Sequence, residues 1–265
     1  MTGISYDRAT AEQYRLAREV PRAGLAAWRA AIEAAVEATA EAAVEATAER
    51  TPGLTPGTTV LDVGAGTGGF AAALHDWFGV HVVAVEPAEA MRALIPRAPA
   101  TDGRPGIEAL AGRADALPVP DGGADAAWLG SVLHHIPDLP AAARELRRAL
   151  KPGAPVLIRN LFPGRADRDL RVRFFPETVA EIDGYRTVDG VCADFAAAGF
   201  VRRRLVAVPQ ESAPSLGHYA RLLRRDTDSK LRALSDEDFE RGMARLRAAD
   251  PAAPATSWMD LLVLA

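Results

Sequence analysis

The sequence predicts one enlarged α/β domain, in which a mostly parallel sheet carries helices on both faces. Three observations support this fold class. The chain has 265 residues, 49% hydrophobic and 25% charged, which suits a globular protein with a sizeable core. From residue 58 onward, short apolar runs alternate with helix-like segments, as in a doubly wound sheet. A glycine-rich turn at residues 64–69 joins the first apolar run to the first of these helices.

The N-terminal arm, residues 1–50, is helical in pattern, with a break expected at Pro21 and Gly24. Its second piece contains a tandem duplication, because the octapeptide AAVEATAE at residues 34–41 recurs at residues 42–49. Eight residues exceed two helical turns by roughly 80°, so the repeated faces drift around the helix. We therefore interpret the duplication as a lengthened helix and not as a repeat protein.

Seven apolar runs bounded by Gly, Pro or polar turns predict seven strands. We expect the last strand to close the sheet beside the previous one. The expected strands are residues 58–63, 81–85, 107–111, 124–129, 154–160, 200–208 and 257–265, and the expected helices are residues 68–78, 88–95, 139–150, 187–198 and 214–249.

Two segments are too long to be simple connections between these elements. Residues 161–199 and 209–256 are expected to cover the substrate site, because long insertions commonly carry function. We divide the chain into a helical arm or lid at residues 1–53 and the main domain at residues 54–265.

Composition argues against several classes of protein. The formal net charge is −4 and no long basic run is present, so nucleic acid is not expected as a partner. The single cysteine, Cys192, excludes an internal disulfide and a thiolate metal cluster. The sequence shows no signal peptide and no apolar span of about 20 residues, which predicts a cytoplasmic protein that does not enter membranes.

The turn VLDVGAGTGGF, residues 60–70, is the central motif. Its glycines allow the backbone to approach a ligand closely. Gly64, Gly66 and Gly69 also match the dinucleotide pattern GxGxxG, with Glu86 at a suitable distance to bind a ribose. The glycines alone therefore leave an NAD-dependent oxidoreductase open as an alternative.

Three acidic positions favour S-adenosylmethionine instead. Asp62 lies just before the glycines, where its carboxylate suits a cationic sulfonium and would repel a pyrophosphate. Glu86 ends the second strand, so its two oxygens can accept hydrogen bonds from both ribose hydroxyls. Met91 follows and can pack against adenine or in the core, and Asp115 follows the third strand, where it can accept the adenine amino group.

With these motifs the sequence resembles the class I S-adenosylmethionine-dependent methyltransferases, in the small-molecule branch called type 11. The matching stretches are VLDVGAGTGGF, VVAVEPAEAM, GRADALPVPDGGADAAWLG, SVLHHIPD and LKPGAPVLIRN, in family order. The resemblance implies a Rossmann-like seven-stranded sheet with six parallel strands and the last inserted antiparallel, a helical lid, and S-adenosylhomocysteine as product. No metal is expected, because the only histidine pair is adjacent in sequence and no Asp or Glu cluster surrounds it at ligand spacing. It implies a cofactor site formed by Asp62, Gly64, Ala65, Gly66, Glu86, Pro87, Met91, Asp115, Ala116, Gly130 and Ser131.

Candidates for the acceptor site follow the fourth strand or lie outside the sheet. A neutral imidazole in the His134–His135 pair could take the acceptor's proton, although LHHIPD is common in the family and His135 also suits a structural role. Three phenylalanines suit either an apolar wall or the core. The expected catalytic residues are His134, His135 and Tyr14, and the expected acceptor-binding residues are Tyr6, Tyr14, His134, Phe162, Phe174, Phe175, His218 and Tyr219.

The expected reaction is SN2 methyl transfer to an O, N or nucleophilic C atom of a small molecule, by a monomer or homodimer. The Ala- and Arg-rich composition suggests a bacterium with a GC-rich genome, which favours secondary metabolism and an aromatic acceptor such as a phenol or indole. Macromolecule methylation is the remaining alternative. An NPPY-like tetrapeptide after the fourth strand would indicate methylation of amino groups on nucleic acid bases. This sequence has LGSVLHH there instead, which argues against such a substrate.

Overall fold

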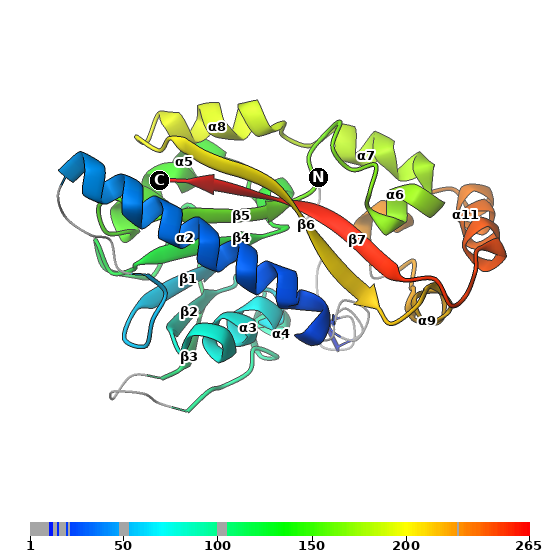
Figure 1. Ribbon diagram of the computed structural model, residues 1–265, viewed down its shortest axis with the longest axis horizontal. Helices are drawn as coiled ribbons and strands as arrows, with labels where there is room; N and C mark the ends of the chain where they lie inside the picture. The colour runs from blue at the N-terminus through cyan, green and yellow to red at the C-terminus, as the bar shows by residue number, and fades with distance from the viewer. Residues whose placement is uncertain are drawn as a thin grey trace.

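Seven strands form one mixed sheet in the order β3-β2-β1-β4-β5-β7-β6 (Figure 1). The computed structural model describes residues 11, 12, 15, 20, 22–47, 53–99, 105–226 and 228–265. Strands β1 to β5 pair in parallel, and β7 is antiparallel to both of its neighbours, β5 and β6. The strands are β1 Thr59–Val63, β2 His81–Val85, β3 Ile107–Leu110, β4 Ala126–Gly130, β5 Val156–Asn160, β6 Arg202–Ala213 and β7 Ala255–Leu264.

Helices cover both faces of this sheet (Figure 1). On one face, α2 (Ala26–Thr47) and α3 (Gly69–Phe78) pack over a core that includes Trp28, Leu74 and Trp128. On the other face, α5 (Leu139–Ala149) and α8 (Val188–Ala196) pack over a second core. The expected α/β class, seven strands and single antiparallel insertion are confirmed.

Local capping explains where the covering helices begin. Gly68 precedes α3 with a φ of 78°, a left-handed conformation that glycine adopts without strain. The Asp138 carboxylate accepts a 2.9 Å hydrogen bond from the Ala141 N–H at the start of α5. The Thr187 hydroxyl caps α8 in the same way. These caps lie within two residues of the starts that the sequence predicts.

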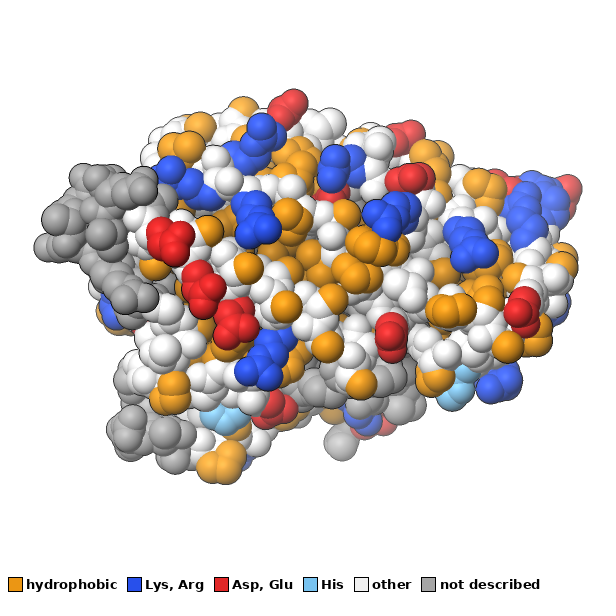
Figure 2. Space-filling model, viewed as in Figure 1, with side chains coloured by type: hydrophobic (Ala, Val, Ile, Leu, Met, Phe, Trp, Pro, Cys, Tyr) orange, Lys and Arg blue, Asp and Glu red, His pale blue; other side chains and the backbone are white. Residues whose placement is uncertain are grey.

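The N-terminal arm contributes to the core. A 3₁₀ turn at Arg22–Leu25 leads into α2, close to the predicted break. The Trp28 ring is fully buried and makes edge contacts with Trp128 and Phe70. The opposite side of α2 is exposed, and a row of acidic side chains follows this helix in Figure 2. On the face shown there, Lys and Arg side chains are scattered and form no continuous basic patch.

A helical cap stands at one end of the sheet (Figure 1). Its elements come from two chain segments, one after β5 and one between β6 and β7, and they share a third hydrophobic cluster centred on Phe175, Leu216 and Leu246. The cap elements are α6 Leu170–Phe174, a 3₁₀ turn Pro176–Thr178, α7 Val179–Asp183, α9 Leu216–Leu222, α10 Ser229–Arg232 and α11 Asp236–Ala248.

Three element predictions need correction. The helix expected over residues 214–249 is wrong as one piece, because Ser215 and Ser235 each cap a new helix within it. The helix expected over 88–95 is only Glu89–Arg92, and Pro96 follows closely. Strand β6 runs to Ala213 because its second half pairs with β7. Within the described parts of the chain, no helix combines the length and apolar character needed to cross a membrane.

Candidate functional site

A cavity of about 730 Å³ opens at the carboxyl ends of β1, β4 and β5, between the sheet and the cap. Ligands of α/β sheets bind at this edge, and the volume lies within the usual range for small-molecule sites. One end of the cavity is the glycine turn, and the other end is formed by the cap and β6. Its wall includes Asp62, Gly64, Ala65, Gly66, Phe70, Trp128, Gly130, Ser131, Arg159, Arg171, Gln210, Tyr219, Asp228 and Ser257.

The glycine turn serves both packing and access. A Cβ on Gly64 would collide with Val132, and one on Gly68 would lie 2.9 Å from Ile95 Cγ2, so these two glycines permit close packing. A Cβ on Gly66 would meet no atom within 4 Å, and the residue has a φ of 58°. Gly66 therefore presents bare backbone to open space at the cavity wall.

Glu86 is buried beside this turn at the end of β2. Its Oε2 accepts a 2.9 Å hydrogen bond from the Gly66 N–H, and its Oε1 accepts one of the same length from the Ala88 N–H. Two backbone donors hold the carboxylate in place, and its oxygens keep lone pairs for further donors. The structure thus brings Glu86 against the glycine turn, although the side chain is not part of the cavity wall.

Asp62 lies beneath the turn and is only 2% exposed. Burial, with a further contribution from the charge of Glu86, raises the pKa of Asp62 to about 7. Its Oδ2 has no hydrogen-bond partner among the described residues, and the same is true of the indole nitrogen of Trp128. Burying a carboxylate oxygen without a hydrogen-bond donor costs free energy of folding, and a ligand that donates to this oxygen would remove that cost.

Four other predicted cofactor residues lie outside the cavity wall. Met91 is buried in α4 (Glu89–Arg92), and Pro87 is exposed in the connection from β2. Asp115 forms a bidentate ion pair with Arg113, which lowers the pKa of the Asp115 carboxyl. Ala116 pairs with Arg113 in a short β-bridge. These residues follow β2 and β3, on the side of the turn away from the cap.

Ser131 lies in the cavity wall directly after β4 and is hydrogen-bonded to Arg159 of β5. It follows β4 with a φ of 57°, in the left-handed region that is uncommon for residues other than glycine. Its hydroxyl accepts a 2.8 Å hydrogen bond from Arg159, and its N–H donates to the Arg159 carbonyl. Such strain tends to occur at functional sites.

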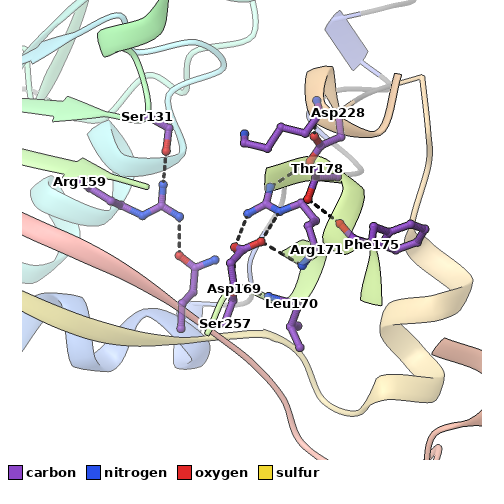
Figure 3. A network of polar contacts seen from close by, with 11 residues as sticks. Ser131, Arg159, Asp169, Leu170, Arg171, Phe175, Thr178, Asp228 and Ser257 are labelled. Carbon is purple, nitrogen blue, oxygen red and sulfur yellow. Dashed lines mark hydrogen bonds and ion pairs between the residues drawn. The ribbon is translucent and has the colours of Figure 1, made fainter. Parts of the chain in front are cut away.

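A buried ion-pair network joins the two cap segments (Figure 3). The Arg171 guanidinium donates two hydrogen bonds to Asp169 and a third, 2.9 Å long, to Asp228. Asp169 also accepts a 2.7 Å bond from Ser257 on β7. Burial opposes ionisation of Asp169, but the Arg171 charge and these hydrogen bonds keep the pKa of Asp169 below its usual value. The network positions α6 and α10 over the cavity.

The predicted catalytic histidines lie outside the cavity wall as the structure describes it. The His134 ring stacks on Tyr185 with 4.7 Å between ring centroids, and His135 is exposed. Tyr219 lines the cavity, but its neighbour His218 does not.

The aromatic wall is not where the sequence suggests. Phe162 and Phe175 are fully buried and Phe174 is 5% exposed, because they pack in the hydrophobic cores. Phe70 and Trp128, together with the predicted Tyr219, supply the aromatic part of the cavity. Tyr6 and Tyr14 lie outside the described residues.

The sequence analysis did not identify most of the residues that line the cavity on the side of the cap and β6. Arg159 and Gln210 lie 51 positions apart, and Arg171 and Asp228 lie 57 apart, so no local motif links them. One signal was available: Arg159 is a charged residue at the end of an apolar strand whose carboxyl end faces the site.

Comparisons with known proteins find a family-model match for the central part of the chain. Residues 61–158 match the family model described as a methyltransferase domain. Over 153 residues the chain is 31% identical to 2-methyl-6-phytyl-1,4-hydroquinone methyltransferase of Synechocystis, covering 54% of this chain and 46% of that protein. Over 51 residues it is 49% identical to 2-phytyl-1,4-naphtoquinone methyltransferase of Synechococcus elongatus, covering 18% and 22% respectively. The chain thus matches less than half the length of either relative.

Solved structures agree on the fold. A candidate methyltransferase from an antibiotic biosynthesis pathway of Anabaena variabilis superposes with a TM-score of 0.55 at 19% identity, covering 84% of this chain and 95% of that one. An S-adenosylmethionine-dependent methyltransferase from Aquifex aeolicus gives 0.51 at 21% identity, covering 77% and 93%.

Proposed function

We propose that the chain binds S-adenosylmethionine and transfers its methyl group to a small-molecule acceptor. The match of residues 61–158 to the methyltransferase domain model and the seven-stranded sheet support this proposal. The observation that carries this proposal is the buried Asp62 Oδ2, which has no hydrogen-bond partner among the described residues and lies in the cavity wall. A cationic ligand beside this oxygen would stabilise the ionised carboxylate.

The residues around Asp62 fit that cofactor. Gly66 leaves open space where any side chain would intrude, and Glu86 holds the turn while offering further acceptor capacity. We assign Asp62, Gly64, Ala65, Gly66, Gly130 and Ser131 to the methionine end and Glu86, Pro87, Met91, Asp115 and Ala116 to the adenosine end. When bound, S-adenosylmethionine supplies an electrophilic methyl group on its sulfonium sulfur.

The remaining part of the cavity is the proposed acceptor site. It extends from Gly130 to the cap, so an acceptor there would lie between the glycine turn and Arg159. Methyl transfer requires mainly that the protein position the acceptor and exclude water. The buried network of Arg171 holds the cap in place for that purpose.

We further propose that the acceptor is aromatic. Phe70 and Trp128, whose rings stack 4.5 Å apart, form one side of the cavity. The names of the two cyanobacterial relatives specify a hydroquinone and a naphtoquinone, which are planar rings. This preference is secondary to the cofactor assignment and has a separate test.

Calorimetry tests the cofactor assignment. Purified, cofactor-stripped protein should give a saturable heat with S-adenosylhomocysteine and none with NADH. The reverse result would indicate an oxidoreductase and would overturn the proposal. Incubation with methyl-labelled S-adenosylmethionine and a panel of phenols, indoles, amines and aliphatic acids should then place label on an aromatic compound.

A further inference from the structure

Trp128 is a fully buried residue of β4 whose indole nitrogen has no hydrogen-bond partner among the described residues. The side chain nevertheless belongs to the cavity wall. An indole N–H is a donor only, so a group that carries a lone pair must satisfy it. Buried tryptophans usually find such a partner within the protein. Here a bound molecule can supply it.

The bare backbone of Gly130 leaves room beside this nitrogen. Gly130 lies two residues after Trp128 on β4, so both residues face the same side of the sheet, and both line the cavity. A Cβ at Gly130 would lie only 2.8 Å from Trp128 Nε1. Gly130 is not one of the glycines with a positive φ, so its backbone conformation does not require glycine. Its missing side chain keeps the space between the cavity and the indole nitrogen open.

Neighbouring rings hold the indole in one orientation. The Phe70 ring stacks on Trp128 with 4.5 Å between ring centroids, and Trp28 makes an edge contact at 5.9 Å. Little side-chain entropy then remains to be lost when a ligand binds. The indole nitrogen of Trp28 has no hydrogen-bond partner either, but Trp28 lies outside the cavity wall as the structure describes it. Trp128 is therefore the indole donor that faces a ligand.

Asp62 is the neighbour of Trp128 across the sheet. The two residues pair in register on β1 and β4, so their side chains lie side by side on one face. Asp62 Oδ2 requires a donor or a cation, whereas Trp128 Nε1 requires a lone pair. The sulfonium that we place beside Asp62 is a poor acceptor for an N–H. Because β4 lies between β1 and β5, Trp128 is on the side of Asp62 where we place the methyl acceptor.

We propose that the Trp128 Nε1–H donates a hydrogen bond to an oxygen of the methyl acceptor, so that the substrate is an aromatic compound that carries a carbonyl or hydroxyl oxygen. The proposal rests on the proposed function, because it names the substrate class of that same cavity. A site built around a buried donor rejects an analogue that lacks the matching acceptor atom. Trp128 thus selects oxygen-bearing rings over hydrocarbon rings of the same shape.

Nuclear magnetic resonance tests the hydrogen bond directly. The chain has four tryptophans, so a ¹H–¹⁵N spectrum contains four indole N–H signals, and Trp128→Phe identifies that of residue 128. The probes are acetophenone and α-methylstyrene, in which a CH₂ group replaces the carbonyl oxygen. We expect acetophenone to shift the Trp128 signal downfield in a saturable way and α-methylstyrene to cause no downfield shift.

Both titrations are made with and without saturating S-adenosylhomocysteine, whose own binding is measured by calorimetry. Failure of the cofactor to bind would count against the proposed function, whereas the response to acetophenone alone still tests the Trp128 donor. Failure of acetophenone to shift the Trp128 signal under either condition would overturn the proposal. So would a downfield shift caused by S-adenosylhomocysteine that acetophenone does not change, because the cofactor would then be the partner of the indole.

Two substitutions locate the effect through the ratio of the affinities for acetophenone and α-methylstyrene. Trp128→Phe removes the N–H and should lower this ratio about tenfold, the usual effect of one hydrogen bond to a buried group. Gly130→Ala keeps the indole but fills the space beside its nitrogen, and should lower the ratio to a similar extent. Trp258→Phe, which removes a half-buried indole of β7 that packs on Arg168, is the matched control and should leave the ratio unchanged.

The ratio separates substrate binding from a structural role, because a general loss of packing weakens both probes alike. An unchanged ratio in Trp128→Phe and Gly130→Ala would overturn the proposal. If Trp128→Phe does not fold, single phenylalanine variants of the other three tryptophans identify the remaining indole signal, and the Gly130→Ala ratio decides.

Discussion

The Gly66 N–H donates a 2.9 Å hydrogen bond to Oε2 of Glu86, so the glycine turn after β1 and the end of β2 are tied together. The turn therefore depends on a side chain 20 residues further along. Loss of that side chain should affect both the shape of the turn and any ligand that the carboxylate contacts.

For Glu86→Ala we expect a loss of S-adenosylhomocysteine affinity of roughly 1.5–3 kcal/mol, the usual cost of removing a charged hydrogen-bonding group. Calorimetric titration measures it. Glu89→Ala, on an exposed position of the next helix, is the control. Wild-type affinity in Glu86→Ala would remove this residue from the cofactor site.

Asp62 should make stability depend on pH. Burial raises its pKa from 3.8 to about 7 in the folded protein, so between these values the folded state holds more protons than the unfolded state. Stability therefore falls as pH rises from about 4 to 7. Asp62→Asn should remove this loss and raise the melting temperature at pH 8 more than at pH 4. Parallel melting curves for the two proteins at all pH values would contradict the assignment.

The same carboxyl should govern binding of the sulfonium. Between about pH 6 and pH 8 Asp62 ionises, so affinity for cationic S-adenosylmethionine should rise more steeply with pH than affinity for S-adenosylhomocysteine, whose sulfur is neutral. In Asp62→Asn the two slopes should become equal. Identical slopes in the unaltered protein would place the sulfur away from Asp62.

Breaking the cap network should be costly. Asp169→Asn leaves the Arg171 charge buried with less compensation, which typically costs about 3–5 kcal/mol. Denaturant unfolding measures the change. Arg247→Gln, which breaks the exposed pair with Glu240 in the same cap, should cost less than about 1 kcal/mol. Comparable losses in the two variants would show that the network is not a main determinant of cap stability.

His134 offers a test of the sequence-based catalytic assignment. Because its ring stacks on Tyr185 and does not line the described cavity, we expect His134→Ala to lower the melting temperature and to leave turnover within a few-fold of wild type. A general base typically contributes 10²–10⁴-fold. A fall in turnover of that size, with unchanged cofactor affinity, would restore the histidine to the mechanism.

Local patterns predicted the strands and the turn well because buried parallel strands are continuous apolar runs. The stretch TVLDV is buried at all five positions, and the glycines that follow it adopt the positive φ values that the motif requires. The sequence pointed to Asp62, Gly66 and Ser131 because each lies within three residues of the end of such a strand.

Long-range pairing explains what the sequence did not reveal. Strand β6 extends to Ala213 only because β7 lies beside it, and Gln210 on β6 contacts Arg159 on β5 only in the folded chain. Phe162 and Phe175 suited a cavity wall by composition, but the folded chain uses their large apolar rings to fill its cores.

The pairing of Ala213 with Ala255 has an evolutionary consequence. The whole excursion from residue 214 to residue 254 leaves and re-enters the sheet at adjacent positions, so its ends are already joined by the hairpin of β6 and β7. Such an excursion can be exchanged for another of different length at small entropic cost. Replacement of residues 214–254 during evolution would therefore change the cap over the proposed acceptor site and leave the proposed cofactor-binding part of the sheet unaltered.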